Sequence, residues 1–136
     1  MPLVIAEPGS PRCLQLWQAC DVRISSTLVI AEAHAALAQA KRLGRLTPPQ
    51  HQAADKLLRH RTEELDLVTP SRHIVEKAAE LALAQALRGY DAIHLATALT
   101  LDIQDLVAIT ADQKLLAAFM ALGVRTANPT HPNLFS

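Results

Sequence analysis

The stretch from residue 87 to residue 99 constrains the fold more than any other part of the chain. It reads Leu-Arg-Gly-Tyr-Asp-Ala-Ile-His-Leu-Ala-Thr-Ala-Leu, and Gly89 can adopt the positive φ angle that ends a helix. Apolar side chains then cover most of the circumference of the next helix: Ile93, Leu95, Ala96, Leu99 and Ile103. We therefore predict a helix buried on nearly every side, with Asp91 in the first turn, where the helix dipole favours a carboxylate.

The composition is that of one globular domain, which we expect to span residues 1–136. Half of the residues are hydrophobic, but only 3% are aromatic, so the apolar content favours helices packed through small side chains. The sequence contains no apolar run of the ~20 residues that a membrane span needs and no secretory leader pattern. These features predict a cytoplasmic protein. The net charge of zero gives no argument for a nucleic-acid partner by itself.

Short apolar segments alternate with helical patterns along the chain. We predict strands at residues 22–24, 65–68, 106–109 and 124–126. Helices are predicted to begin at Ser10 and to span residues 27–43, 47–64, 69–87 and 112–122, with a loose tail at 128–136. Thr47 and Gln50 fit a capping box at the start of the helix at 47–64, and Thr69 is expected to open the helix at 69–87. This alternation indicates an α/β fold with a parallel sheet flanked by helices on both faces.

Within the helix at 27–43, one carboxylate is predicted to lie on a largely apolar stripe. The stripe consists of Leu28, Glu32, Ala35, Ala36 and Gln39. A carboxylate in such surroundings costs free energy unless it gains a cation, hydrogen-bond donors or water. Glu32 is therefore a candidate ligand of a cation.

Three acids fall at the carboxyl ends of predicted strands, where ligands gather in α/β sheets: Glu32, Asp91 and Asp112. Each one also has an ordinary structural explanation. Asp112 can cap its helix, Asp91 can interact favourably with a helix dipole, and Glu32 can point to water. Taken singly, none of the three distinguishes a structural role from a functional one.

Taken together, the three acids predict a metal site. Two carboxylates ~4 Å apart repel each other by about 4 kcal/mol at an effective dielectric constant of 20, so a cluster needs a counter-ion or a proton. Mg²⁺ or Mn²⁺ suits such oxygen ligands and can activate water against a phosphodiester. Thr110 could hydrogen-bond an acid or a metal-bound water.

These residues also carry a resemblance. The stretch 88–99 resembles the central motif of the PIN-domain nucleases, in particular the VapC toxins of bacterial toxin–antitoxin pairs. Residues 26–32 and 106–116 resemble the second and last acidic motifs of that family, in the same order and spacing. The resemblance implies a PIN-like three-layer fold and metal-dependent cleavage of RNA, with Glu32, Asp91 and Asp112 as metal-binding and catalytic residues. It also implies a VapB-like antitoxin partner and a homodimer.

One family element is missing from the sequence. The family opens with a strand that ends in an aspartate, whereas this chain begins at Met1 where the following helix should be under way. We expect either an original start further upstream or a degenerate, inactive copy. With three acids where the family has four, one metal ion is expected rather than two.

Other residues carry weaker signals. His94 lies one turn beyond Asp91 and is expected to pack or to orient a neighbour, with a ligand role as the alternative. The segment from Ala33 to Thr62 has six basic residues and one acid, which makes Lys41, Arg42 and Arg45 candidates for contacting RNA. Solvated helix faces are the commoner explanation of such a run.

The sequence leaves three hypotheses open. The first is a VapC-like endoribonuclease with Mg²⁺ or Mn²⁺ at Glu32, Asp91 and Asp112. The second is a PIN-like module without chemistry that retains an antitoxin-binding or dimer surface. The third is an α/β domain whose three acids never meet.

Overall fold

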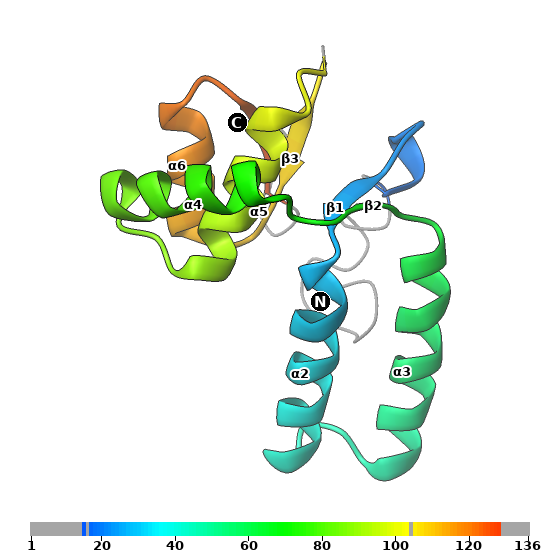
Figure 1. Ribbon diagram of the computed structural model, residues 1–136. Coiled ribbons are helices and arrows are strands. Elements are labelled where there is room, and N and C mark those ends of the chain that lie inside the picture. Colours follow the sequence, from blue (N-terminus) through cyan, green and yellow to red (C-terminus); the bar gives the residue numbers. More distant parts are fainter. Residues whose placement is uncertain (1–14, 16, 104, 129–136) are drawn as a thin grey trace. The chain divides into compact units, whose positions relative to one another are not determined.

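The computed structural model describes residues 15, 17–103 and 105–128, which form two compact units, Met1–Leu67 and Val68–Ser136 (Figure 1). Residues 15 and 17–19 are helical, whereas the predicted helix start at Ser10 lies outside the described residues. The predicted tail is wrong at its first residue, because Asn128 is buried; residues 129–136 lie outside the described part.

The first unit is built on a hairpin of two helices, α2 (Leu28–Arg42) and α3 (Pro48–Glu63), which lie side by side (Figure 1). Gly44 ends the first helix with φ 73°, as its position predicts. Thr47 and Gln50 form the predicted capping box, in which each side chain accepts a hydrogen bond from the other residue's backbone N–H. Four buried side chains join the two helices: Ala33, Leu37, Ala54 and Leu58.

The apolar stripe predicted for α2 is wrong. The buried residues of this helix are Ala33, Leu37 and Ala40, whereas Ala35, Ala36 and Gln39 are exposed. Leu37 explains the difference, because it is the largest apolar side chain in the middle of the helix and α3 packs on its face. Alanines fall on both faces of α2, so their spacing alone could not identify the buried face.

Two short strands flank the hairpin and pair with each other, β1 (Ile24–Ser26) and β2 (Asp66–Val68). The predicted first strand at 22–24 begins two residues too early, whereas the second matches its prediction. At the start of this pair the backbone N–H of Asp66 donates to the carbonyl oxygen of Arg23 at 2.7 Å.

The second unit contains α4 (Arg72–Gln85), α5 (Gly89–Thr100), β3 (Val107–Ile109), α6 (Gln113–Ala121) and β4 (Arg125–Ala127). β3 and β4 pair in parallel, with Ala108 opposite Thr126, and α6 forms the connection between them. A parallel pair requires such a crossover, so this half of the chain confirms the predicted α/β arrangement.

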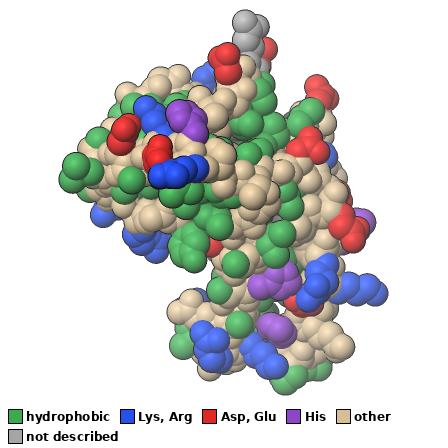
Figure 2. All heavy atoms as spheres, in the orientation of Figure 1, with side chains coloured by type: hydrophobic (Ala, Val, Ile, Leu, Met, Phe, Trp, Pro, Cys, Tyr) green, Lys and Arg blue, Asp and Glu red, His purple; other side chains and the backbone are tan. Residues whose placement is uncertain are grey.

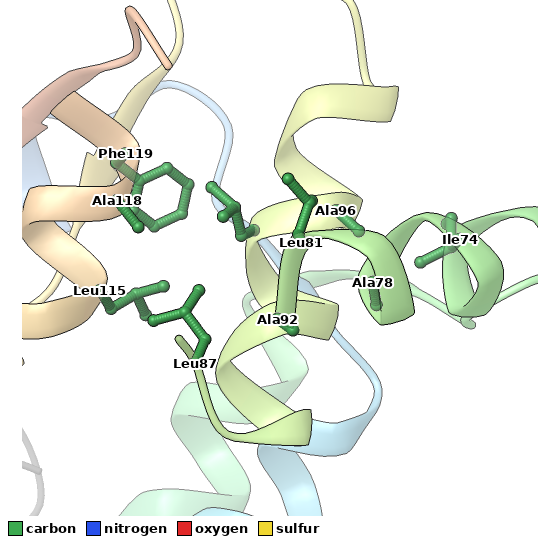
Figure 3. Close-up of a cluster of buried hydrophobic side chains, with 10 residues drawn as sticks. Ile74, Ala78, Leu81, Leu87, Ala92, Ala96, Leu115, Ala118 and Phe119 are labelled. Atoms are coloured by element: carbon green, nitrogen blue, oxygen red, sulfur yellow. The ribbon is translucent and has the colours of Figure 1, made fainter. Parts of the chain in front are cut away.

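The core of the second unit lies between α4, α5 and α6 (Figure 3). Its buried members are Ile74, Ala78, Leu81, Leu87, Ala92, Leu95, Ala96, Leu115, Ala118 and Phe119. Ala92, Leu95 and Ala96 are completely buried, whereas Ile93 and Leu99 are half-buried, so the central helix is largely enclosed but less completely than predicted. The small alanines let α4 and α5 approach closely, as the low aromatic content indicated.

Three details around this core correct the sequence predictions. Ala86, with φ 52°, ends α4, whereas Gly89 is the first residue of α5. Ser71 caps α4 instead of Thr69, because its hydroxyl accepts the N–H of Ile74. Ile103 does not extend the buried face, since α5 stops at Thr100 and the Ile103 side chain is exposed.

Among the helices in the described part of the chain, none combines the length and the apolar character that crossing a bilayer requires.

The first unit also contains a charged contact at its only tryptophan. The indole Nε1–H of Trp17 donates to Oε2 of Glu64 at 2.6 Å, and Nη1 of Arg61 lies 3.1 Å from Oε1. The hydrogen bond from Trp17, together with the charge of Arg61, holds the pKa of Glu64 below its usual 4.5. The contribution of this carboxylate to stability is therefore complete above pH 4.5 and is lost as the pH falls through the lowered pKa.

We predict that Glu64→Gln makes the unfolding free energy of the first unit less sensitive to pH below 4.5, because the ionisable partner of Trp17 is gone. Urea unfolding followed by Trp17 fluorescence between pH 3 and pH 6 measures this slope. The exposed neighbour Glu63, changed to Gln, serves as the control and should keep the wild-type slope. An unchanged slope in Glu64→Gln would contradict the assignment.

Candidate active site

A hollow of about 380 Å³ opens in the second unit beside the first turns of α5 and α6. It is lined by Ala86, Arg88, Asp91, Asp112, Gln113 and Lys114. Two of the three predicted acids therefore line one depression, although they are 21 residues apart in the sequence.

Asp91 lies in the first turn of α5, as predicted, and its side chain is only 12% exposed. Its Oδ2 accepts a hydrogen bond from Nε of Arg88 at 3.1 Å. The partial positive charge of the helix N-terminus and the guanidinium both attract this carboxylate.

Asp112 is the N-cap of α6, which confirms its ordinary structural role. Its Oδ1 accepts the backbone N–H of Leu115 at 3.0 Å, while Oδ2 lies 3.7 Å from Nη2 of Arg88. The hydroxyl of Thr110 accepts the backbone N–H of Asp112 at 3.1 Å and so fixes the turn before the helix. One carboxylate oxygen thus caps the helix, and the other lies near the same cation as Asp91.

Arg88 was missed by the sequence reasoning, although its spacing to Asp91 gave a signal. An arginine three residues before an aspartate at a helix start can reach that carboxylate, since residues i and i+3 are neighbours on a helix surface. The backbone before α5 places Arg88 near this carboxylate. Ala86 takes the left-handed conformation, and the buried Leu87 packs beside Leu115 of α6 (Figure 3). A non-glycine residue in that conformation costs about 1–2 kcal/mol, which this packing offsets.

The donor set of the hollow fits a hard divalent cation in part. Two aspartate oxygens already converge on one positive group, and carboxylate oxygens are the ligands that Mg²⁺ and Mn²⁺ prefer. Within the described residues of the second unit, no third His, Cys, Asp or Glu joins this pair to complete a metal-binding group.

The remaining predicted residues fall elsewhere. Glu32 is a half-buried residue of α2 in the first unit, so its meeting with Asp91 and Asp112 stays a prediction. His94 is half-buried on α5, one turn after Asp91, and its expected orienting role also stays a prediction.

The three basic residues proposed to contact RNA lie together at the end of α2. Lys41 and Arg42 form its last turn, Arg45 follows Gly44, and all three are exposed. Figure 2 shows Lys and Arg side chains beside His side chains over the α2–α3 hairpin. Cations in the last turn of a helix also interact favourably with its dipole, so their position alone does not require a ligand.

Comparison with known proteins identifies relatives across most of the chain. The sequence profile of the PIN domain matches residues 3–119. Ribonuclease VapC45 of Mycobacterium tuberculosis (strain CDC 1551 / Oshkosh) is 36% identical over 125 residues, which are 92% of this chain and 87% of the relative. Ribonuclease VapC49 of Mycobacterium tuberculosis (strain ATCC 25618 / H37Rv) shows the same identity and coverage.

We predict that the two roles of Asp112 can be separated by substitution. Asp112→Asn keeps an oxygen for the N–H of Leu115 and should leave the unfolding free energy nearly unchanged, whereas Asp112→Ala should lower it by about 1 kcal/mol. Urea unfolding of both variants without divalent metal measures the difference. Equal stability of the two variants would mean that the cap contributes nothing.

Proposed function

This chain belongs to the PIN-domain family, and from that premise we propose that it is a metal-dependent endoribonuclease whose active site contains Asp91 and Asp112. The names of its relatives, both ribonucleases, support the reaction class. The single observation that carries the proposal is that Asp91 and Asp112 direct one oxygen each toward the same cation.

In this proposal, Asp91, Asp112 and Glu32 hold one Mg²⁺ or Mn²⁺ ion. Such an ion, when bound, supplies a water of lowered pKa and stabilises negative charge on a phosphodiester. Asp91 contributes a nearly buried carboxylate, and the cap at Leu115 fixes the orientation of Asp112. Thr110 acts as a positioning residue, because its hydroxyl holds the backbone of Asp112.

The substrate is proposed to be held by positive side chains. Lys114 lines the hollow beside Asp112, where it could attract a phosphate of the RNA backbone. Lys41, Arg42 and Arg45 supply a second group of cations on the first unit. Contacts of this kind are independent of base identity and weaken as salt is added.

The biological setting follows the same premise. We propose a VapB-like antitoxin that covers the active site, a homodimer as the assembly, and the cytoplasm as the compartment. RNA, the antitoxin and this chain would meet there.

A second candidate is a PIN module that binds its partner without cleaving RNA. One observation favours it: Arg88 already neutralises part of the charge of Asp91 and Asp112. This candidate predicts a soluble complex with the antitoxin and no metal binding in calorimetry.

We predict that Asp91→Asn lowers the rate of RNA cleavage with Mg²⁺ or Mn²⁺ by about a hundredfold or more. Losing the groups that only support metal ligands already costs about 10–100-fold, so losing a ligand should cost at least as much. The assay is cleavage of structured RNA followed on denaturing gels, with EDTA added in parallel. Glu76→Gln, an exposed carboxylate of α4 paired with Arg72, is the matched control and should cleave at the wild-type rate.

Equal cleavage by Asp91→Asn and the wild type would reject the proposed site. No cleavage by the wild type, together with a stable antitoxin complex, would favour the binding module.

We predict separately that Glu32→Gln weakens Mn²⁺ binding and cleavage in the same assays, because it removes the ligand proposed to come from the first unit. Glu63→Gln is the control, since it removes an exposed carboxylate from α3 of the same unit. Calorimetry with Mn²⁺ measures the affinity. Wild-type affinity in Glu32→Gln would exclude this residue as a ligand.

A further inference from the structure

We infer that Arg88 is the internal counter-ion of the Asp91–Asp112 pair and that a divalent cation must displace its guanidinium to bind there. This inference rests on the proposed metal site. It adds that the Arg88 guanidinium competes with the metal ion for the same carboxylates.

The first step is the geometry of the guanidinium. Two different nitrogens of Arg88 face the two acids, Nε toward Asp91 at 3.1 Å and Nη2 toward Asp112 at 3.7 Å. A planar fork can serve two carboxylates at once, which a single ammonium group cannot do in the same way. Arg88 therefore links the first turns of α5 and α6.

The second step is that the guanidinium and a metal ion would use the same carboxylate oxygens. Oδ1 of Asp112 already accepts the N–H of Leu115, so Oδ2 has more lone-pair capacity for a cation, and Oδ2 is the oxygen paired with Arg88. The hydrogen bond at Asp91 also uses Oδ2. A metal ion at these oxygens and a guanidinium in its present position would bring two positive groups together, which the Coulomb energy opposes.

The third step is that displacement needs only a side-chain movement. The Arg88 side chain is 80% exposed, so it can rotate into water with little loss of packing. Its backbone is held by the buried Leu87, which belongs to the core with Leu115. The hollow can therefore exchange one cation for another while the fold stays in place.

The experiment measures Mn²⁺ affinity by calorimetry for the full chain, Arg88→Gln, Arg88→Lys and Arg72→Gln. Arg88→Gln should bind Mn²⁺ about three- to tenfold more tightly, as expected from removing two partly exposed ion pairs. Arg88→Lys should lie between this variant and the wild type. Arg72→Gln is the matched control, since it removes an exposed arginine paired with Glu76 at 3.0 Å, and it should bind as the wild type does.

A second readout uses no metal. In EDTA, Arg88→Gln should unfold at a lower urea concentration than Arg72→Gln, because only the former leaves two neighbouring carboxylates without this counter-ion.

The outcomes separate the inference from the proposed function. Wild-type or weaker Mn²⁺ binding by Arg88→Gln would overturn the inference while leaving the metal site intact. Absence of binding in every protein would overturn both. Binding by Arg88→Gln together with undetectable binding by the wild type would support the inference in its strongest form.

Discussion

Two negative charges held beside the first turns of neighbouring helices impose the main constraint on the second unit. Each position is favourable by itself, because Asp91 interacts favourably with the dipole of α5 and Asp112 caps α6. Brought to one hollow, the two carboxylates repel each other and need a cation. Arg88 faces both carboxylates, and the convergence of their oxygens on one cation is the physical basis for proposing a divalent ion there.

The hydrophobic core of the second unit fixes the positions of these two carboxylates. α5 is enclosed at Ala92, Leu95 and Ala96, so its N-terminus cannot shift without disturbing the packing on α4. Leu87 and Leu115 join the segment before α5 to the first turn of α6 (Figure 3). Catalytic geometry generally depends on such support from rigid elements, because small displacements of a ligand change metal affinity and orientation.

The sequence predicted the features that local chemistry determines. The capping box at Thr47, the buried α5 and the cap at Asp112 all follow from short-range rules and are confirmed. The predictions failed where tertiary packing decides between similar residues. Alanines on both faces of α2 hid the buried stripe, and Ala86 took the left-handed turn that Gly89 was expected to make, because Leu87 gains burial there. For the site, spacing indicated Asp91 and Asp112, whereas the bridge by Arg88 depends on the approach of α6 to α5 and could not be read from neighbouring letters.

The central claim is that one divalent ion binds the oxygens of Asp91 and Asp112 together with Glu32. Paramagnetic broadening by sub-stoichiometric Mn²⁺ in ¹⁵N-labelled protein tests it most directly, because the effect falls steeply with distance from the ion. The account predicts that the backbone amide signals of Asp91, Asp112 and Glu32 broaden together and recover when excess Mg²⁺ is added. Broadening that spares Asp91 and Asp112, or that is centred on other acids, would contradict it.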